Sequence, residues 1–312
     1  MQLGWMTAIA RRVLPLSCAL ALGIPPLATS HFMWGEVGHR ITAQAAVSAL
    51  PDSMPAFFRN ASGQLAYLNP EPDRWRSRAE QARDPALSIA SGAEHFIDTE
   101  MIPADRRANA FAAPTRNAYA DTLRVLGVSA EVAGVLPFRI LELAQTLRIE
   151  FGLWRAAPNV QTREWIEARI INDAGILGHY VADASNPAHT SVHYNGWVGA
   201  NPNGYATDKQ FHSRFESVYV QSQIALGDVQ PLVGLTPRVY SDLRPAILAY
   251  LNETFGEVEH LYQLDKAAPF NAATTSTADK RFATERLAAG ARMLRDLWWT
   301  AWITSDESAS RR

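Results

Sequence analysis

Apolar residues recur at spacings of three and four along most of this chain, and this pattern restricts what the chain can fold into. The pattern is clear over residues 41–50, 136–151, 163–184, 210–226, 242–264 and 285–303. Such spacing puts apolar side chains on one face of a helix. No stretch alternates convincingly between apolar and polar residues, as a half-buried strand does. We therefore predict an all-α fold, with loops at residues 100–116, 194–208 and 266–279.

The two ends of the chain differ from this helical body. Arg11 and Arg12 precede an apolar run that reaches about Leu27, and small residues follow it, which is typical of a secretory signal peptide. The only cysteine, Cys18, lies inside this segment, so we expect no disulfide in an exported (periplasmic or secreted) mature protein. We predict a signal peptide and pre-tryptophan segment at residues 1–33, one multi-helix domain at 34–304 and a polar tail at 305–312.

The charge balance restricts how a polyanion could be bound. The formal net charge is −2 at pH 7, and removal of residues 1–33 takes away arginines but no acidic residue. No basic excess remains to hold a nucleic acid by counterion release alone. If the substrate is a phosphate ester, bound cations must supply the positive charge.

Two helical stretches each carry a histidine and a carboxylate four residues apart. His179 and Asp183 lie in GHYVADASNPAH, and His212 and Glu216 lie in QFHSRFES. Residues at this spacing share one helix face and can bind one ligand. His189 follows the Asn-Pro pair that ends the first helix. Imidazole and carboxylate without thiolate suit zinc, so the spacing predicts a metal site.

A di-iron helix bundle is the competing metal site. It requires two Glu-x-x-His motifs and two further glutamates. Glu257 and His260 form the one such motif that we find. We interpret this pair as part of a solvated helix face.

Five motifs, taken in order, resemble a known family. They are WGEVGH at residues 34–39, PDRWR around Asp73, HFIDTE from His95, HYVADASNPAH and FHSRFE. They are similar to the trinuclear-zinc phosphodiesterases, the superfamily of bacterial zinc-dependent phospholipase C and the single-strand-specific zinc nucleases. RLAAGARMLRDLW resembles the last helix of that family. The resemblance implies a cleft with three zinc ions and hydrolysis of phosphate esters by a zinc-bound hydroxide.

The resemblance also implies which residues bind the three zinc ions. One zinc takes Asp73, His95, His179 and Asp183, and a second takes His189, His212 and Glu216. The third takes His39, the other oxygen of Asp183, and the α-amine and carbonyl of Trp34. Asp183 is thus expected to bridge two zinc ions, and Asp73 is expected also to orient the attacking water. His193 has no counterpart and is expected in a loop or beside the ligands.

The α-amine of Trp34 can bind zinc only if Trp34 begins the mature chain, because an amide nitrogen is a poor ligand. The best signal-peptidase site follows Ser30, which would leave His31 in front. We expect exposure of Trp34, because WGEVGH keeps the tryptophan-to-histidine spacing. His31 is the alternative ligand.

Residues near the expected zinc ligands distinguish the two branches of the family. Arg76 matches the arginine that the nucleases use against substrate phosphate. Phe96 and Asp98 match a base-stacking ring and a base-binding carboxylate, but the HFxD string also occurs in the lipases, so of these three residues only Arg76 discriminates. Val37 and Arg74 stand where the choline-binding lipases have a glutamate and a tyrosine.

Glu216 favours the lipases, because the nucleases usually have aspartate there, and so does the lack of cysteines in the mature chain. We favour single-stranded nucleic acid or a nucleotide as substrate, with phospholipid as the alternative. A third possibility is a non-catalytic helical binding protein whose zinc is structural. No protein partner is implied.

Overall fold

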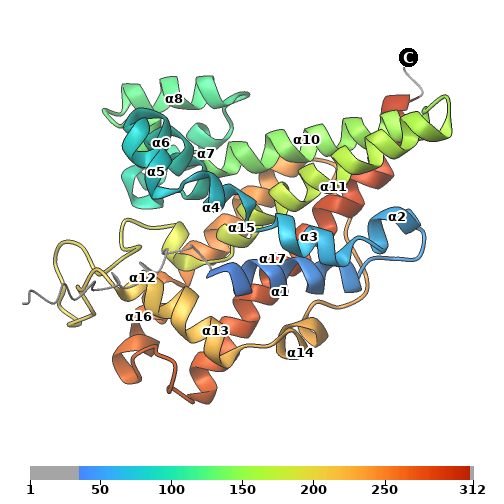
Figure 1. Cartoon of the computed structure of the whole chain (residues 1–312). Coiled ribbons are helices and arrows are strands. Elements are labelled where there is room, and N and C mark those ends of the chain that lie inside the picture. The colour runs from blue at the N-terminus through green and yellow to red at the C-terminus, as the bar shows by residue number, and fades with distance from the viewer. Residues whose placement is uncertain (1–34, 310–312) are drawn as a thin grey trace, which may run out of the picture. The chain divides into compact units, whose positions relative to one another are not determined.

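Long helices that pack against one another form the centre of the protein. A computed structural model describes residues 35–309. In it, α10 (Leu136–Arg155) packs along α11 (Val160–Asp183) and α17 (Thr277–Ala309), and α1 (Gly35–Ser48) packs on both α11 and α17 (Figure 1). Each overlaps one of the stretches whose periodicity predicts a helix. Their apolar faces form the core, in which the Trp298 indole is fully buried and donates to the Ala174 carbonyl at 3.3 Å.

Shorter helices surround this centre. The remaining α-helices are α2 (Ala56–Arg59), α3 (Ser62–Leu68), α4 (Glu71–Trp75), α5 (Arg78–Arg83), α6 (Pro85–Gly92), α7 (Ala104–Phe111), α8 (Arg116–Val125), α9 (Ala130–Ala133), α12 (Phe211–Ser213), α13 (Val220–Gln223), α14 (Leu226–Val229), α15 (Leu243–Gly256) and α16 (Val258–Ala267). Short 3₁₀ turns are η1 (Ala93–His95), η2 (Thr99–Met101), η3 (Pro187–His189) and η5 (Gln230–Leu232), and η4 (Arg214–Tyr219) is a π-helix. Residues 35–309 contain no strand, only an isolated bridge between Tyr194 and Gly196. The fold is all-α, as the periodicity predicts.

The ends of α11 follow from local chemistry. Its N-cap is Asn159, whose side chain accepts a hydrogen bond from the Thr162 amide at 2.8 Å, which satisfies a backbone donor that the helix leaves unpaired. After Asp183 the chain turns, and the Asn186 side chain accepts from the Ala188 amide at 3.1 Å. This turn leads into η3 and places His189 directly beyond the C-terminal end of α11.

The prediction of a loop at residues 100–116 was wrong. Most of this segment is helical, with α7 and the end of η2 inside it. α7 begins after Pro103 and buries Ala110 and Phe111 at its C-terminal end. The apolar pattern of α7 is too short to predict a helix by itself. In the structure α7 packs against α8, and such packing stabilises short helices.

Other boundaries also differ from those that periodicity predicts. The stretch 242–264 divides into α15 and α16 at Glu257, directly after Gly256. The stretch 210–226 contains the π-helix η4 and leaves the helical conformation at Ile224. The segment 194–208 has no helix, as expected, and α16 and α17 extend slightly into the predicted loop at 266–279.

All described residues belong to one compact unit. The segment expected to be a signal peptide, residues 1–33, lies outside the described residues. α17 continues to Ala309, beyond the predicted domain end at residue 304. Over residues 35–309, no helix combines the length and apolar character needed to cross a membrane.

Candidate metal centre

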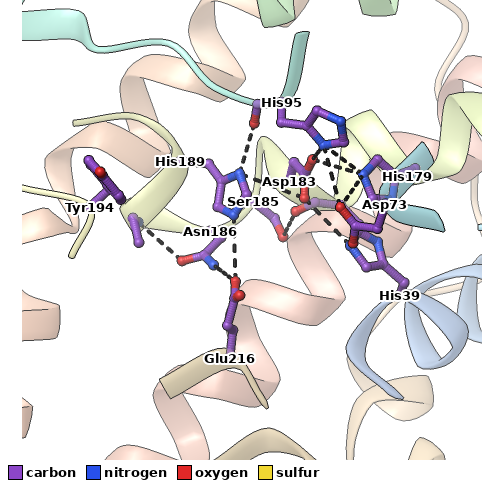
Figure 2. Close-up of polar contacts among 12 residues, drawn as sticks. His39, Asp73, His95, His179, Asp183, Ser185, Asn186, His189, Tyr194 and Glu216 are labelled. Atoms are coloured by element: carbon purple, nitrogen blue, oxygen red, sulfur yellow. Dashed lines mark hydrogen bonds and ion pairs between the residues drawn. The ribbon is translucent and has the colours of Figure 1, made fainter. Parts of the chain in front are cut away.

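The last turns of α11 carry the residues around which the candidate site is built. His179 and Asp183 are fully buried, and His179 Nε2 lies 3.2 Å from Asp183 Oδ2. This confirms the geometric expectation that a spacing of four brings the two side chains together. Figure 2 shows both side chains within a larger group of polar residues that come from several helices.

Asp73 at α4 and His95 at η1 approach this pair from another part of the chain. His95 Nδ1 lies 3.1 Å from Asp183 Oδ2 and 2.9 Å from His179 Nε2. Asp73 Oδ1 is 3.8 Å from each of the two ring nitrogens (Figure 2). Imidazole nitrogens and carboxylate oxygens that converge in this way form a donor set for a cation.

His39 of α1 completes this side of the centre. Its ring stacks on that of His179 with centroids 4.1 Å apart, and its Nε2 lies 3.5 Å from Asp183 Oδ1. The same nitrogen is 4.0 Å from Asp73 Oδ2. The two oxygens of Asp183 therefore face different histidines.

A second group of donors lies beside the first. His212 Nε2 is 2.9 Å from Glu216 Oε2, and His189 Nε2 is 3.5 Å from the same oxygen. Glu216 lies on the π-helix η4, and His212 lies on α12 directly before it. His189 Nδ1 is also 3.7 Å from Asp183 Oδ1, so His189 stands between the two groups.

Hydrogen bonds to the second ring nitrogens hold the histidines in place. His39 Nδ1 bonds to Asn69 Oδ1 at 2.9 Å, His189 Nδ1 donates to the His95 carbonyl at 2.8 Å, and His212 Nδ1 donates to the Tyr194 carbonyl at 3.1 Å. Such bonds leave the other nitrogen of each ring available as a ligand. Asn186 Nδ2 similarly donates to Glu216 Oε2 at 3.1 Å.

No sequence pattern predicts a role for Asn69, and the Asn-Pro pair predicts only a helix end at Asn186. Asn69 is 30 residues from His39 in the chain, and no motif marks the partner of a histidine at such a separation. Asn186 lies between the two histidines of GHYVADASNPAH. Its place inside that motif is a signal that could have indicated a role beyond helix termination.

The donor set fits metal ions. Three overlapping groups of buried or partly buried side chains could each hold one: His39, His179 and Asp183; Asp73, His95 and His179; His189, His212 and Glu216. Buried atoms of these groups that form no hydrogen bond among the described residues include His39 Nε2, Asp73 Oδ2, Asp183 Oδ1 and His189 Nε2. Buried polar atoms without partners are costly, and a bound cation would satisfy them. Trp34, the other expected ligand, lies outside the described residues.

Burial and mutual repulsion set the protonation of these groups. Burial lowers the pKa of His95 to about 3 and that of His39 well below its usual value, with His179 adding repulsion at His39. Both rings are therefore neutral at neutral pH, the form that binds metals. Burial opposes ionisation of Asp183, but the positive charges of His179 and His189 hold its pKa well below the usual range.

A cavity of about 220 Å³ adjoins the second donor group. Its lining includes His189 and His212 together with Arg76, Phe96 and Asp98, and also Tyr194. Arg76 packs over Gly92, where a Cβ would lie 3.2 Å from Arg76 Nη2. The structure thus brings the three residues that were expected to bind substrate to one cavity at the candidate metal centre. Tyr194, which is 54% exposed, was not predicted.

The histidines without an assigned ligand role lie elsewhere. His193 stacks on Trp197 with centroids 3.9 Å apart, and its Nδ1 accepts from the Val198 amide at 3.0 Å. It is therefore a loop residue rather than part of a donor group. His260 is paired with Glu257 at 3.0 Å with both side chains substantially exposed, which agrees with a solvated helix face.

Comparison of the chain with models of protein families, with curated proteins and with solved structures finds no match.

Proposed function

We propose that the protein is an exported, zinc-dependent phosphodiesterase that acts on single-stranded nucleic acid or nucleotides. The observation that carries this proposal is the cavity in which Arg76, Phe96 and Asp98 adjoin His189 and His212. The cavity unites a cationic group, an aromatic ring and a hydrogen-bonding carboxyl with a metal-donor cluster. A structural zinc site, closed by its ligands, would not require such an opening, which favours an enzyme over a non-catalytic binding protein.

The donor groups would hold up to three zinc ions, as the family resemblance implies. The side-chain ligands would be His39, Asp73, His95, His179, Asp183, His189, His212 and Glu216. Bound zinc lowers the pKa of water and neutralises charge on a phosphodiester. Asp73, buried next to Asp183, has its pKa raised to about 7 mainly by burial. It is the carboxyl that we assign to orienting a water.

The other cavity residues have separate roles in this proposal. Arg76 would bind a phosphate oxygen, for which its guanidinium is geometrically suited. The Phe96 ring would stack on a base, a contact that tolerates any sequence. Burial, with Glu100 nearby, raises the pKa of Asp98 to about 7. Near neutral pH this carboxyl can therefore both donate to and accept from a base edge.

The surroundings of Arg74 argue against a choline-type phospholipid headgroup. Arg74 Nη1 lies 2.7 Å from Glu71 Oε2, and its Nη2 lies 3.4 Å from Glu36 Oε1. Its guanidinium stands over the Tyr67 ring, 4.5 Å from the centroid. Glu36, Glu71 and Tyr67 are groups of the kind that could bind a quaternary ammonium. They already contact the guanidinium of Arg74. Glu216 remains the feature that favours a phospholipase C.

A hydrolysis panel tests the proposal. Metal-loaded mature protein is assayed on single-stranded DNA, RNA, 3′-nucleotides and phosphatidylcholine. We expect turnover of the nucleic acids and little or no release of phosphocholine. Phosphatidylcholine as the preferred substrate would support the phospholipase C alternative, and inactivity on every phosphate ester would support the non-catalytic one.

Variants of the cavity residues separate substrate binding from metal binding. Arg76→Ala should lower nucleic-acid turnover by about ten-fold or more while leaving the zinc content unchanged, because it removes a charged contact to phosphate. Arg124→Ala is the matched control, because its side chain is 77% exposed and pairs with Asp121. If the two variants were equally active, Arg76 would not be part of the substrate site.

A further inference from the structure

A second cavity, of about 480 Å³, lies between α15, α17 and the segment 233–240. It has no lining residue in common with the cavity at the candidate metal centre. Three arginines, Arg238, Arg292 and Arg295, contribute to its lining, and its acidic residues are Glu253 and Asp296. The pairing of these charges decides what the cavity can bind.

Arg295 is neutralised inside the protein. Its Nε and Nη2 lie 2.8 and 2.6 Å from Asp296 Oδ1, and its Nη1 donates to the Val233 carbonyl at 2.9 Å. Asp296 also accepts from the backbone amide of Arg238 at 3.1 Å. The Arg295–Asp296 pair therefore holds the segment 233–240 against α17, and the pair itself contributes no net charge to the cavity.

Glu253 is similarly used by a fourth arginine, Arg286, which does not itself line the cavity. Arg286 of α17 has only 9% of its side chain exposed, and its Nη2 lies 3.0 Å from Glu253 Oε1. The Nη1 of Arg286 is buried and forms no hydrogen bond among the described residues.

Two guanidinium groups that line the cavity are left without an anionic partner. Among the described side chains, neither Arg238 nor Arg292 forms an ion pair within 4.0 Å. Arg292 Nη1 donates to the Leu232 carbonyl at 2.9 Å, which uses one of its five N–H groups. Burial lowers the pKa of Arg292, although Glu253 nearby favours its charged form. The cavity and the adjoining Arg286 together therefore carry a net positive charge of about two.

We propose that this cavity binds a small phosphate monoester as a dianion, held by Arg238 and Arg292. A phosphate dianion matches the two unpaired positive charges, and its oxygens match the forked donors of arginine. The cavity volume is in the range of small-molecule sites, so there is room for an organic group. Val233 and Met293 give this group an apolar wall.

The location of the ligand is tested by diffraction. Crystals of the metal-loaded mature protein are soaked in selenate, a dianion of phosphate shape whose anomalous scattering identifies its position. We expect selenate between Arg238 and Arg292. Selenate at the metal centre with none in this cavity would overturn the proposal.

Calorimetric titration with thymidine 5′-monophosphate, inorganic phosphate and thymidine tests the ligand class. We expect the protein to bind the monophosphate, with an affinity that Arg292→Gln lowers by about ten-fold or more. Arg238→Gln should also lower this affinity, without any change in folding. Arg124→Gln should leave the affinity unchanged. Hydrolytic activity at the metal centre should be unaffected by Arg238→Gln. Equal binding by all four proteins would refute the site, and equal affinity for inorganic phosphate and monophosphate would refute a monoester ligand.

Discussion

Asp183 offers its two oxygens to different histidines. Oδ2 lies 3.1 Å from His95 Nδ1 and 3.2 Å from His179 Nε2, whereas Oδ1 lies 3.5 Å from His39 Nε2. We expect Asp183→Asn to weaken metal binding by more than about 100-fold, because it removes the negative charge that faces all three of these histidines. Elemental analysis after dialysis measures the bound metal.

His193→Ala is the control for this experiment. His193 stacks on Trp197 in the loop and belongs to no donor group found among the described residues, so its removal should leave the metal content unchanged. Equal metal loss in the two variants would contradict the assignment of Asp183 as the central ligand.

Glu150 of α10 links stability to pH. It is 1% exposed, and burial, with Asp173 nearby, raises its pKa from 4.5 to about 7 although Arg169 Nη2 lies 2.8 Å away. The folded state then binds more protons than the unfolded state between these pH values, so the contribution of Glu150 to stability is full below pH 4.5 and is lost as the pH rises through about 7. We expect Glu150→Gln to raise the free energy of unfolding at pH 8 by on the order of 1–3 kcal/mol.

Urea denaturation at pH 5 and pH 8 measures this effect. The gain from Glu150→Gln should be much smaller at pH 5, where the wild-type carboxyl is already largely protonated. Glu164→Gln, at an exposed position on α11, should change stability little at either pH. A gain of the same size at both pH values would show that packing, rather than ionisation, causes it.

At the scale of helices, a glycine lets α11 approach α3. A Cβ at Gly175 would lie 2.4 Å from Leu68 Cβ, an atom close to the backbone that cannot move alone. Gly175→Ala should therefore lower the free energy of unfolding, because overpacking costs on the order of 1–3 kcal/mol and the gain in helix propensity is only about 1 kcal/mol. Thermal denaturation measures the change.

Gly63→Ala on α3 is the matched substitution, because nothing lies within 4 Å of a Cβ there. It should leave stability unchanged or raise it slightly. If Gly175→Ala were equally harmless, the close approach of α3 and α11 would not be needed for the fold.

At the scale of the whole molecule, the donor groups join parts of the chain that are far apart. Their side chains come from α1, α4, η1, α11, η3, α12 and η4. Removing metal ions that bind there would leave buried charges and polar atoms that only protons can compensate. We expect chelation to lower the melting temperature of the purified protein by several degrees and to abolish its phosphodiesterase activity. Calorimetry with and without chelator measures the first effect.

Addition of Zn²⁺ to the chelated protein should restore both stability and activity. Mg²⁺ is the control ion, because it prefers octahedral oxygen ligands and should restore neither. A melting temperature that does not respond to the chelator, in protein shown to have lost its metal, would mean that the donor groups are stable without a cation.

Local spacing in the sequence was enough to determine the all-α fold class and the pairs His179–Asp183 and His212–Glu216. Periodicity and an i, i+4 relation are properties of a single helix, so they can be read without knowledge of what packs beside it. The motif resemblance named His39, Asp73 and His95, but no local pattern places them near α11.

Only the tertiary structure brings these residues to one place and shows the hydrogen bond between Asn69 and His39. It alone also determines that residues 104–111 are helical and that Arg238 and Arg292 line one cavity without an acidic partner among the described side chains. The physical reason is that these features depend on contacts between separate helices, most of them distant in the chain. Such contacts are set by how whole helices pack, whereas the sequence records directly only the pattern along each helix.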